Sequence, residues 1–494
     1  MLFNSWNFLI FFPVVVGIYF LIPQRFKKIW LLCASYYFYM NWNAAYAILI
    51  LGVTIISYIA GILIEKRAGE ERRGQKLPLI ICVMISLGVL FVFKYLNFVL
   101  ANVNHILSMT GSQMRLPLAM GLVLPVGISF YTFQALGYVV DVYRGEVAAE
   151  RNFIQYALFV SFFPQLVAGP IERSKNLLKQ LDTPKEFDYD SAKNGLLLML
   201  WGYFEKMWIA DRASVLVDSV YLNYQEYSAG MLVAATALFA IQIYCDFGGY
   251  SHIAIGAAQV LGIRLMDNFR QPYLARNIKD FWSRWHISLS TWFRDYVYIP
   301  LGGNRRGALR TYINLFLTFL LSGLWHGASW HYVVWGGMNG FYQVVSRMTA
   351  GGRARIREVL HIREENGLYR LFQTIVTFVL ADFAWLFFRA YGLSDAFRMI
   401  RHILVNRTFL PEFANGTLFT LGLRPFAVYQ LILSLVILLV VDLLHEKKIS
   451  LRRWCARQHI VIRWSIYLVV MVAFVVLLIQ NYGRPAAEFI YFQF

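Results

Sequence analysis

The stretch YINLFLTFLLSGLWHGASWHYVVWGGMNGFYQVV, residues 312–345, is apolar over most of its length and has a histidine, His326, near its middle. As one straight helix it would be about 50 Å long at about 1.5 Å per residue, which exceeds a bilayer core of about 30 Å. We therefore predict a bend or break, at Ser322-Gly323 or at Gly336-Gly337. Non-helical backbone at membrane depth must be surrounded by protein or by a water-filled cavity, so we expect a cavity beside His326.

The composition of the whole chain indicates an integral membrane protein. Of its 494 residues, 59% are hydrophobic, 17% are aromatic and only 15% are charged. Apolar segments recur from Phe8 to Leu478 without a polar block large enough to fold alone, so we predict one all-α, polytopic membrane domain over residues 1–494. The net charge of +18 lies mainly in short loops between apolar segments, as membrane topology requires, and argues against nucleic acid as a partner.

Hydropathy predicts roughly 11–13 membrane segments. The first, from about Phe8 to Ile22, has no small-residue cleavage site after it and is expected to be retained. Basic residues follow the first and third segments, which places those loops in the cytoplasm and the N-terminus outside. The turn Asn41-Trp42-Asn43 separates the second and third segments, and residues 99–116 and 401–422 are expected to be outward-facing loops. Further segments are expected near residues 78–98, 118–140, 154–168, 195–212, 230–262, 312–345, 371–390, 426–444 and 461–481.

A second unusual segment, Ile278 to Ile299, has the pattern of an amphipathic helix. Charged residues interrupt its apolar stripe, which suits a membrane interface or the wall of a polar cavity better than lipid. In one continuous helix, His286 lies one turn from Trp282 and from Ser290, off the centre of the stripe, where we expect it to face a solvated interior. The stripe consists of Phe281, Trp285, Leu289, Trp292 and Tyr296.

His326 and His286 are the candidate catalytic residues. Ionisable residues inside a membrane are costly and by default indicate a functional site. The alternative is that either histidine only hydrogen-bonds between packed helices, a contact worth about 1 kcal/mol, and the sequence alone weighs the two interpretations equally. A positioned imidazole can act as a general base on a hydroxyl when the electrophile arrives activated, as in a thioester. The sequence has no Walker A loop, Gly-x-Ser-x-Gly elbow or Rossmann glycine fingerprint.

The sequence does not predict a metal site. His326 and His331 are five residues apart, about 140° around an ideal helix, and they share a face only if the helix breaks. No cysteine or acidic partner stands at ligand spacing from them. The four cysteines are scattered singly, without the spacing of a disulfide framework, at Cys33, Cys82, Cys245 and Cys455.

Several longer motifs are specific when taken together. They are Phe163 to Ile171, Tyr244 to Phe247 with Gly249-Tyr250-Ser251, Asn268-Phe269 through Pro272-Tyr273, Phe281 to Ser290, Trp292 to Tyr296 and Gly323 to Gly327. With these motifs the chain resembles the membrane-bound O-acyltransferase (MBOAT) family, in the bacterial branch that includes the alginate O-acetylase membrane subunit and the D-alanyl transferase of teichoic acid. The resemblance covers nearly the whole chain.

The resemblance implies a fold and a set of residue roles. The fold is a ring of tilted and re-entrant helices around a central tunnel, with the catalytic core at about 118–345. His326 matches the family's catalytic histidine and His286 its second active-site histidine. The positions expected to contact substrate are Trp285, Arg294, Asp295, Trp325 and Asp246.

The resemblance also implies an activity, which is O-acetylation of an extracytoplasmic polysaccharide, alginate-like or of the cell wall. The expected donor is acetyl-CoA or another acyl thioester presented from the cytoplasm, and no bound cofactor is expected. The implied location is the bacterial cytoplasmic (inner) membrane, where the multi-pass protein works with an exported acetyltransferase-type partner. The alternatives are D-alanyl transfer to teichoic acid from a carrier protein, a polysaccharide or lipid transporter, and a structural scaffold.

Details of the sequence favour the acetylase type within this branch. The loop Tyr298 to Arg305 and the terminal residues Phe489 to Phe494 resemble the alginate-type form. Two positions depart from it. His252 stands where an acidic residue is usual, and Asn339 stands where a His-Gly pair is common, which leaves the acceptor and the partner open.

Overall fold

The computed structural model describes the whole chain except residues 68–71, 120–122, 168, 407, 409–410, 481–488 and 491–494. Helices and connecting segments make up the described part, which contains no β-strand, so the all-α prediction is confirmed. In chain order the helices of the N-terminal half are α1 (Trp6–Leu21), α2 (Gln24–Met40), η1 (Ala44–Tyr46), α3 (Ala47–Lys66), α4 (Arg72–Leu90), η2 (Phe91–Tyr95), α5 (Leu96–Met109), α6 (Ile128–Tyr143), α7 (Phe153–Ser161), α8 (Phe163–Leu166), α9 (Ser174–Asp182), α10 (Tyr189–Tyr203), η3 (Phe204–Ala210), α11 (Asp211–Leu222) and η4 (Tyr224–Glu226).

The C-terminal half continues with the longest helix of the described chain, the 32-residue α12. Two of the short helices above, η2 and η3, and one below, η6, are π-helical turns. The remaining elements are α12 (Ala229–Val260), η5 (Pro272–Leu274), α13 (Ile278–Arg284), α14 (Ile287–Phe293), η6 (Arg294–Tyr298), α15 (Ala308–His326), α16 (Trp330–Met348), α17 (Ala350–Val359), α18 (Gly367–Arg389), α19 (Leu393–Val405), α20 (Pro411–Ala414), η7 (Thr417–Phe419), α21 (Pro425–Glu446), α22 (Leu451–Ala456) and α23 (Ile460–Gln480).

The protein is a multi-pass membrane protein. Seven helical stretches of the described residues are long and apolar enough to cross a bilayer: Ala44–Lys66, Gly74–Met109, Ala229–Val260, Ala308–His326, Gly367–Arg389, Pro425–Glu446 and Ile460–Gln480. The other segments expected from hydropathy coincide with shorter helices, such as α1, α6 and α7. The region 195–212 is divided among α10, η3 and α11, and residues 99–109, expected in a loop, belong to α5.

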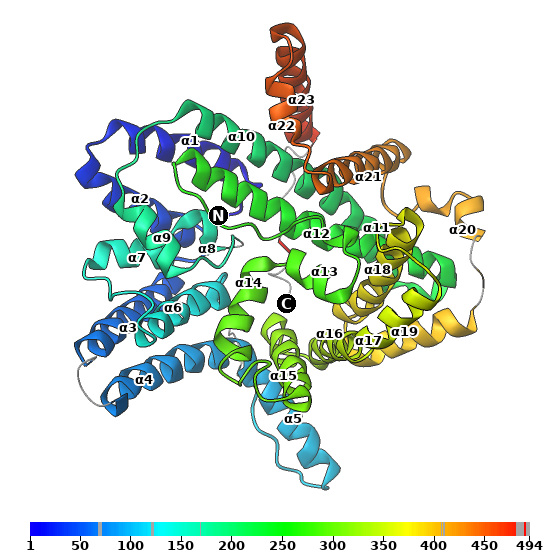
Figure 1. The fold of residues 1–494 in the computed structure, drawn as a ribbon, viewed down its shortest axis with the longest axis horizontal. Coiled ribbons are helices and arrows are strands. Elements are labelled where there is room, and N and C mark those ends of the chain that lie inside the picture. Colours follow the sequence, from blue (N-terminus) through cyan, green and yellow to red (C-terminus); the bar gives the residue numbers. More distant parts are fainter. Residues whose placement is uncertain are drawn as a thin grey trace.

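The helices form an irregular ring around α13 and α14, as Figure 1 shows. In that view α1, α10, α12 and α11 lie along one side, α3, α4 and α6 lie opposite, and α15, α16 and α18 complete the ring. Helices α22 and α23 project outward from it. The ring follows the arrangement that the family resemblance implies, while the central tunnel and the single-domain organisation stay predictions.

The run 312–345 breaks, as its length requires, but not at either predicted glycine pair. Helix α15 ends at His326, Gly327 is extended (φ −165°, ψ 152°), and α16 begins at Trp330. Gly327 leaves no room for a side chain, because a Cβ there would lie 2.2 Å from the Tyr332 ring. The expected breaks were wrong because the two glycine pairs lie inside helices, where Gly323 and Gly336 let α15 and α16 touch.

The prediction of one amphipathic helix over residues 278–299 was also wrong. The chain forms α13, then a sharp turn at Trp285 and His286, then α14 and η6. His286 has a left-handed backbone (φ 42°, ψ 56°), which is uncommon for a residue other than glycine. The turn takes His286 off any regular helical face and buries it completely, so it does not face solvent as expected.

Candidate active site

His326 lies at the end of its helix, inside the protein. It is the last residue of α15, and only 3% of its surface is exposed. Aromatic rings surround the imidazole, with centroid distances of 4.9 Å to Trp325, 5.0 Å to Trp335 and 5.3 Å to Phe388. These rings come from α15, α16 and α18, so three helices fix the position of one imidazole.

His286 is held by the segment that follows α12. The main-chain N–H of Ile287 donates to the carbonyl oxygen of Asn268 (2.9 Å), and the Ser288 hydroxyl donates to Asn268 Oδ1 (2.6 Å). Asn268 in turn donates through Nδ2 to the Ser251 hydroxyl (3.0 Å), which belongs to α12. The strained turn of His286 is therefore anchored, at the two residues that follow it, by one buried asparagine.

The two candidate histidines, 40 residues apart in sequence, meet in the folded protein. The Trp325 ring lies 6.0 Å from the His286 ring and 4.9 Å from that of His326. Phe247 of α12 covers the other side of His286 at 4.5 Å. The structure thus places both histidines and Trp325 at one site, as the resemblance implies, whereas their chemical roles stay predictions.

Two functional candidates in η2 were missed by the sequence analysis. Lys94 Nζ donates to the main-chain oxygens of Trp325 (2.6 Å) and His326 (3.0 Å). The hydroxyl of Tyr95 donates to the oxygen of Leu324 (3.0 Å). The sequence did contain a signal, because a lone lysine within the apolar segment 78–98 indicates an intramembrane charge that pairs with another group of the protein.

Asp246 and Trp285, both expected to contact substrate, lie in separate surroundings. Asp246 forms an ion pair with Lys206 Nζ (2.7 Å) and accepts a hydrogen bond from the main-chain N–H of Ile490 (2.8 Å). Trp285 is 1% exposed and packs against the rings of Phe281 (5.6 Å) and Trp385 (4.9 Å). The position next to Ile490 is occupied by Phe489, whose ring lies 5.5 Å from Phe247, the ring that touches His286. Residues near the end of the chain therefore come within one side chain of His286.

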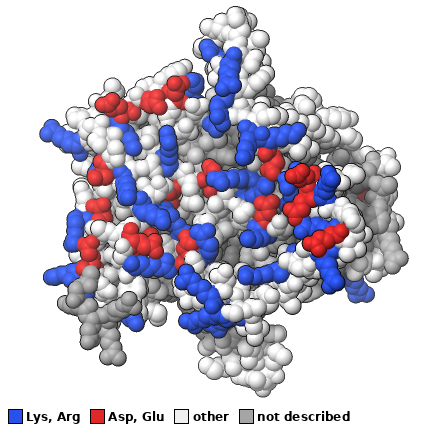
Figure 2. Space-filling model, in the orientation of Figure 1, with Lys and Arg blue, Asp and Glu red and all other residues white. Residues whose placement is uncertain are grey.

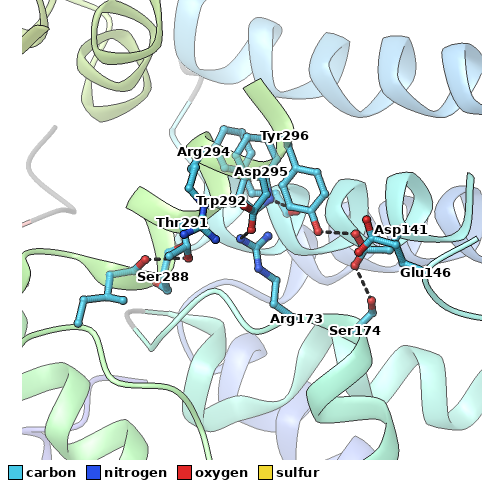
Figure 3. A network of polar contacts seen from close by, with 12 residues as sticks. Asp141, Glu146, Arg173, Ser174, Ser288, Thr291, Trp292, Arg294, Asp295 and Tyr296 are labelled. Atoms are coloured by element: carbon cyan, nitrogen blue, oxygen red, sulfur yellow. Dashed lines mark hydrogen bonds and ion pairs between the residues drawn. The ribbon is translucent and has the colours of Figure 1, made fainter. Parts of the chain in front are cut away.

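Arg294 and Asp295 belong to the polar network of Figure 3. Both oxygens of the Asp295 carboxylate are engaged, one by Arg294 Nε (2.8 Å) and the other by Arg173 Nη2 (2.9 Å). The Tyr296 hydroxyl donates to Asp141 (2.7 Å), so the network fixes η6 against α6. Arg294 keeps 60% of its side chain exposed and Asp295 keeps 28%, so Arg294 is the more accessible of the two to a ligand.

The same elements connect this network to the histidines. Trp292, in α14, donates through Nε1 to the main-chain oxygen of Phe133 (2.9 Å). The Phe133 ring stacks on Trp292 at 4.0 Å and lies 5.8 Å from the Trp325 ring. Asp295 is thus linked to the site through packed rings and not by a direct contact described in the structure.

The two departures from the alginate-type pattern both have hydrogen-bond partners. His252 Nδ1 lies 2.6 Å from Glu205 Oε2 of η3. Asn339 accepts a hydrogen bond from Trp282 Nε1 (3.3 Å) and donates to the oxygen of Trp335 (2.9 Å), and the Trp335 ring touches His326. Asn339 therefore lies one aromatic ring away from the candidate catalytic histidine. Over the described part of the chain, no group of three or more His, Cys, Asp or Glu side chains is arranged to hold a metal ion.

Comparison with known proteins places this site in a family. The sequence model of MBOAT, the membrane-bound O-acyltransferase family, matches residues 146–379. A probable alginate O-acetylase (AlgI) of Pseudomonas aeruginosa is 40% identical over 401 residues, which cover 81% of this chain and 74% of the relative. The chain belongs to the MBOAT family. It is accordingly an O-acyltransferase, and the family match spans both His286 and His326.

Two more MBOAT relatives differ in their acceptors and in how much they share with this chain. A peptidoglycan O-acetyltransferase of Helicobacter pylori is 33% identical, over 81% of this chain and 79% of the relative. A teichoic acid D-alanyltransferase of Bacillus subtilis is 30% identical, but the match covers only 43% of this chain and 56% of the relative. The match to the peptidoglycan O-acetyltransferase therefore covers nearly twice as much of this chain as the match to the D-alanyltransferase.

Proposed function

We propose that this MBOAT protein transfers an acetyl group for the O-acetylation of an extracytoplasmic polysaccharide. The observation that carries the proposal is the pairing of His326 and His286 around Trp325 in a buried site, in a chain that is similar over 81% of its length to acetylases of polysaccharides. D-alanyl transfer is the second candidate, supported by the shorter match to the teichoic acid enzyme.

The proposed reaction needs one proton acceptor and correct alignment. His326 takes the proton from the acceptor hydroxyl as its oxygen bonds to the thioester carbonyl carbon. The carbon–sulfur bond then breaks, and the proton passes to the departing thiolate, so that an ester and a thiol are the products. A positioned base of this kind contributes about 10²- to 10⁴-fold to a rate. His286 holds a reactant or stabilises the charge that develops on the carbonyl oxygen.

The proposed donor is acetyl-CoA or another acyl thioester that enters from the cytoplasm. Lys and Arg side chains, with Asp and Glu between them, are spread across the face seen in Figure 2, and the positive-inside rule, which depends on Lys and Arg, supports assigning such a face to the cytoplasm. Arg294, whose side chain is 60% exposed, is the proposed contact for an anionic part of the donor. The bacterial cytoplasmic membrane is the proposed location, and an exported acetyltransferase-type protein is the proposed partner on the outer side.

The test is the ester-linked acyl content of envelope polysaccharide, released with base and identified by mass spectrometry. Cells lacking the protein are complemented with wild type, His326→Ala or His331→Ala at equal protein levels in the membrane. His331 is the matched control, because it is a buried histidine (6% exposed) that bonds to the Ser329 hydroxyl at the start of α16. We expect acetate to be restored by wild type and His331→Ala but not by His326→Ala.

Other outcomes decide between the candidates. Restoration of D-alanine in place of acetate would assign the protein to teichoic acid modification. Wild-type acetate in the His326→Ala strain would overturn the catalytic role of this residue. No change in any ester, in a strain that makes a modified polymer, would favour a transporter that moves substrate without altering it.

A further inference from the structure

We propose that Lys94 is a positioning residue for catalysis, which holds the last turn of α15 and thereby His326 in place. This inference rests on the proposed role of His326 and adds the device that fixes that residue. Lys94 comes from a membrane helix more than 200 residues earlier in the chain, and it contacts the main chain of the site rather than its side chains.

The geometry at the end of α15 carries the proposal. An α-helix leaves its last four carbonyl groups without partners inside the helix. Here the oxygens of three successive residues accept hydrogen bonds from two adjacent side chains of η2: Leu324 from Tyr95 (3.0 Å), and Trp325 (2.6 Å) and His326 (3.0 Å) from Lys94. A cation at a helix C-terminus is also favoured by the helix dipole. The catalytic helix is therefore capped by another membrane segment.

The element that supplies the cap is itself irregular. η2, Phe91–Tyr95, is a π-helical turn between α4 and α5, within the continuous membrane stretch Gly74–Met109. Such turns are rare and frequent at functional sites. Lys94 and Tyr95 are adjacent in this turn, and both reach the end of α15. The π-helical turn therefore faces the point where α15 stops, next to His326.

The charge of Lys94 needs a reason, because a lysine at membrane depth is costly. Charged residues inside a membrane therefore pair with one another or with backbone carbonyl groups. Its ammonium group donates to the carbonyl oxygens of two successive residues, Trp325 and His326, and lies 5.7 Å from the Trp325 ring. That ring also touches His286. One cation is therefore in contact with the backbone of His326 and with the residue that joins the two histidines.

The experiment measures ester-linked acetate in the complemented strains for Lys94→Met, Lys94→Arg, Tyr95→Phe and Lys27→Met, at equal membrane protein levels. Lys27 is the matched control, because it is buried, donates to the carbonyl oxygen of Lys185 (2.7 Å) and lies over the ring of Tyr19 (4.9 Å), outside the site. Lys94→Met is expected to lower ester-linked acetate by about tenfold or more, since misplacing a reacting group by about 1 Å can lower a reaction rate by about 10²-fold.

The conservative variants separate positioning from general stability. Lys94→Arg keeps a cation that can donate to two carbonyls and should recover most of the loss, while Lys27→Met should stay within about twofold of wild type. Tyr95→Phe removes one neutral hydrogen bond and should lower ester-linked acetate by about fivefold, which corresponds to about 1 kcal/mol.

Several results would overturn the proposal. The first is a wild-type level of ester-linked acetate in Lys94→Met. The second is an equal loss of acetate in Lys27→Met, and the third is no more acetate in Lys94→Arg than in Lys94→Met. If Lys94→Met does not accumulate, Tyr95→Phe decides, and full acetate in that variant would make Lys94 a folding residue only. His326→Ala is measured in the same series to keep the two proposals apart. If His326→Ala loses ester-linked acetate while Lys94→Met keeps it, only the role of Lys94 is refuted.

Discussion

Asn268 determines the shape of the turn that carries His286, and its removal should damage the site without touching either histidine. Asn268→Ala deletes the acceptor for Ser288 and the donor to Ser251, both buried. Each unsatisfied buried group costs about 1–3 kcal/mol, and the left-handed turn keeps only the main-chain bond from Ile287 to residue 268. We expect ester-linked acetate to fall by about tenfold or more, by the same sensitivity to displacement.

The control for Asn268 is another buried asparagine with two hydrogen bonds. Asn314→Ala removes bonds to the oxygens of Leu301 and Gly303, which do not reach the His286 turn. Measured at equal protein level, acetate should be higher in Asn314→Ala than in Asn268→Ala. Equal acetate in the two strains would contradict a special role for Asn268.

Single residues also show what sequence reasoning could reach. His326 was identifiable because a histidine in a long apolar run is costly and conspicuous. The bonds of Lys94 were not, because its partners are 231 and 232 residues away and are main-chain atoms, which carry no sequence signal. The left-handed backbone of His286 was equally hidden, since helical spacing in residues 278–299 predicted a regular helix.

At the level of elements, the contact between α15 and α16 depends on two glycines that face each other. A Cβ on Gly336 would lie 2.4 Å from the carbonyl oxygen of Phe319 and 2.9 Å from the Cα of Gly323. Gly336→Ala must therefore push the helices apart, at a cost of about 1–3 kcal/mol for overpacking. We expect a lower unfolding temperature of the purified protein and less ester-linked acetate.

The neighbouring glycine provides the control for this helix pair. A Cβ on Gly337 would meet its nearest side-chain atom, Cδ1 of Leu320, at an ordinary 3.6 Å. Gly337→Ala should consequently have the unfolding temperature and the ester-linked acetate of wild type. Identical behaviour of the two variants would show that α15 and α16 adjust to each other more easily than their packing indicates.

The same glycines explain why the break in 312–345 was mislocated. Glycine interrupts helices, and it also lets two helices approach closely. Sequence alone does not distinguish these uses, and here Gly323 and Gly336 serve close approach while Gly327 accompanies the break. Helix length predicted that a break must exist, because that requirement depends only on the thickness of the bilayer.

At the level of the whole molecule, one buried cation joins three parts of the ring. Lys206 of η3 forms ion pairs with Asp211 of α11 (2.8 Å) and Asp246 of α12 (2.7 Å), and Asp246 also accepts the N–H of Ile490. Lys206→Met would leave two carboxylates buried together. Breaking a buried pair in this way costs about 3–5 kcal/mol, so we expect a clear fall in unfolding temperature and in membrane protein level.

A half-buried lysine in an ion pair at the surface shows what the same substitution does elsewhere. Lys193 pairs with Asp190 at the surface, and such pairs contribute about 0–1 kcal/mol. Lys193→Met should therefore unfold at nearly the wild-type temperature in the same detergent. A Lys206→Met protein as stable as Lys193→Met would mean that the ring does not depend on this ion pair.

The support of His326 by Lys94 has a consequence for the membrane around the protein. The stretch Gly74–Met109 has 36 residues, and only 17% of its most apolar window is buried inside the protein. At about 1.5 Å per residue it exceeds a bilayer core of about 30 Å, so it tilts, bends at η2 or thickens the bilayer around it, and each of these responses depends on lipid length. We therefore expect lipid length to affect the reaction through the helical stretch that carries Lys94. Rates measured in detergent and in native lipid are then two different quantities for this enzyme.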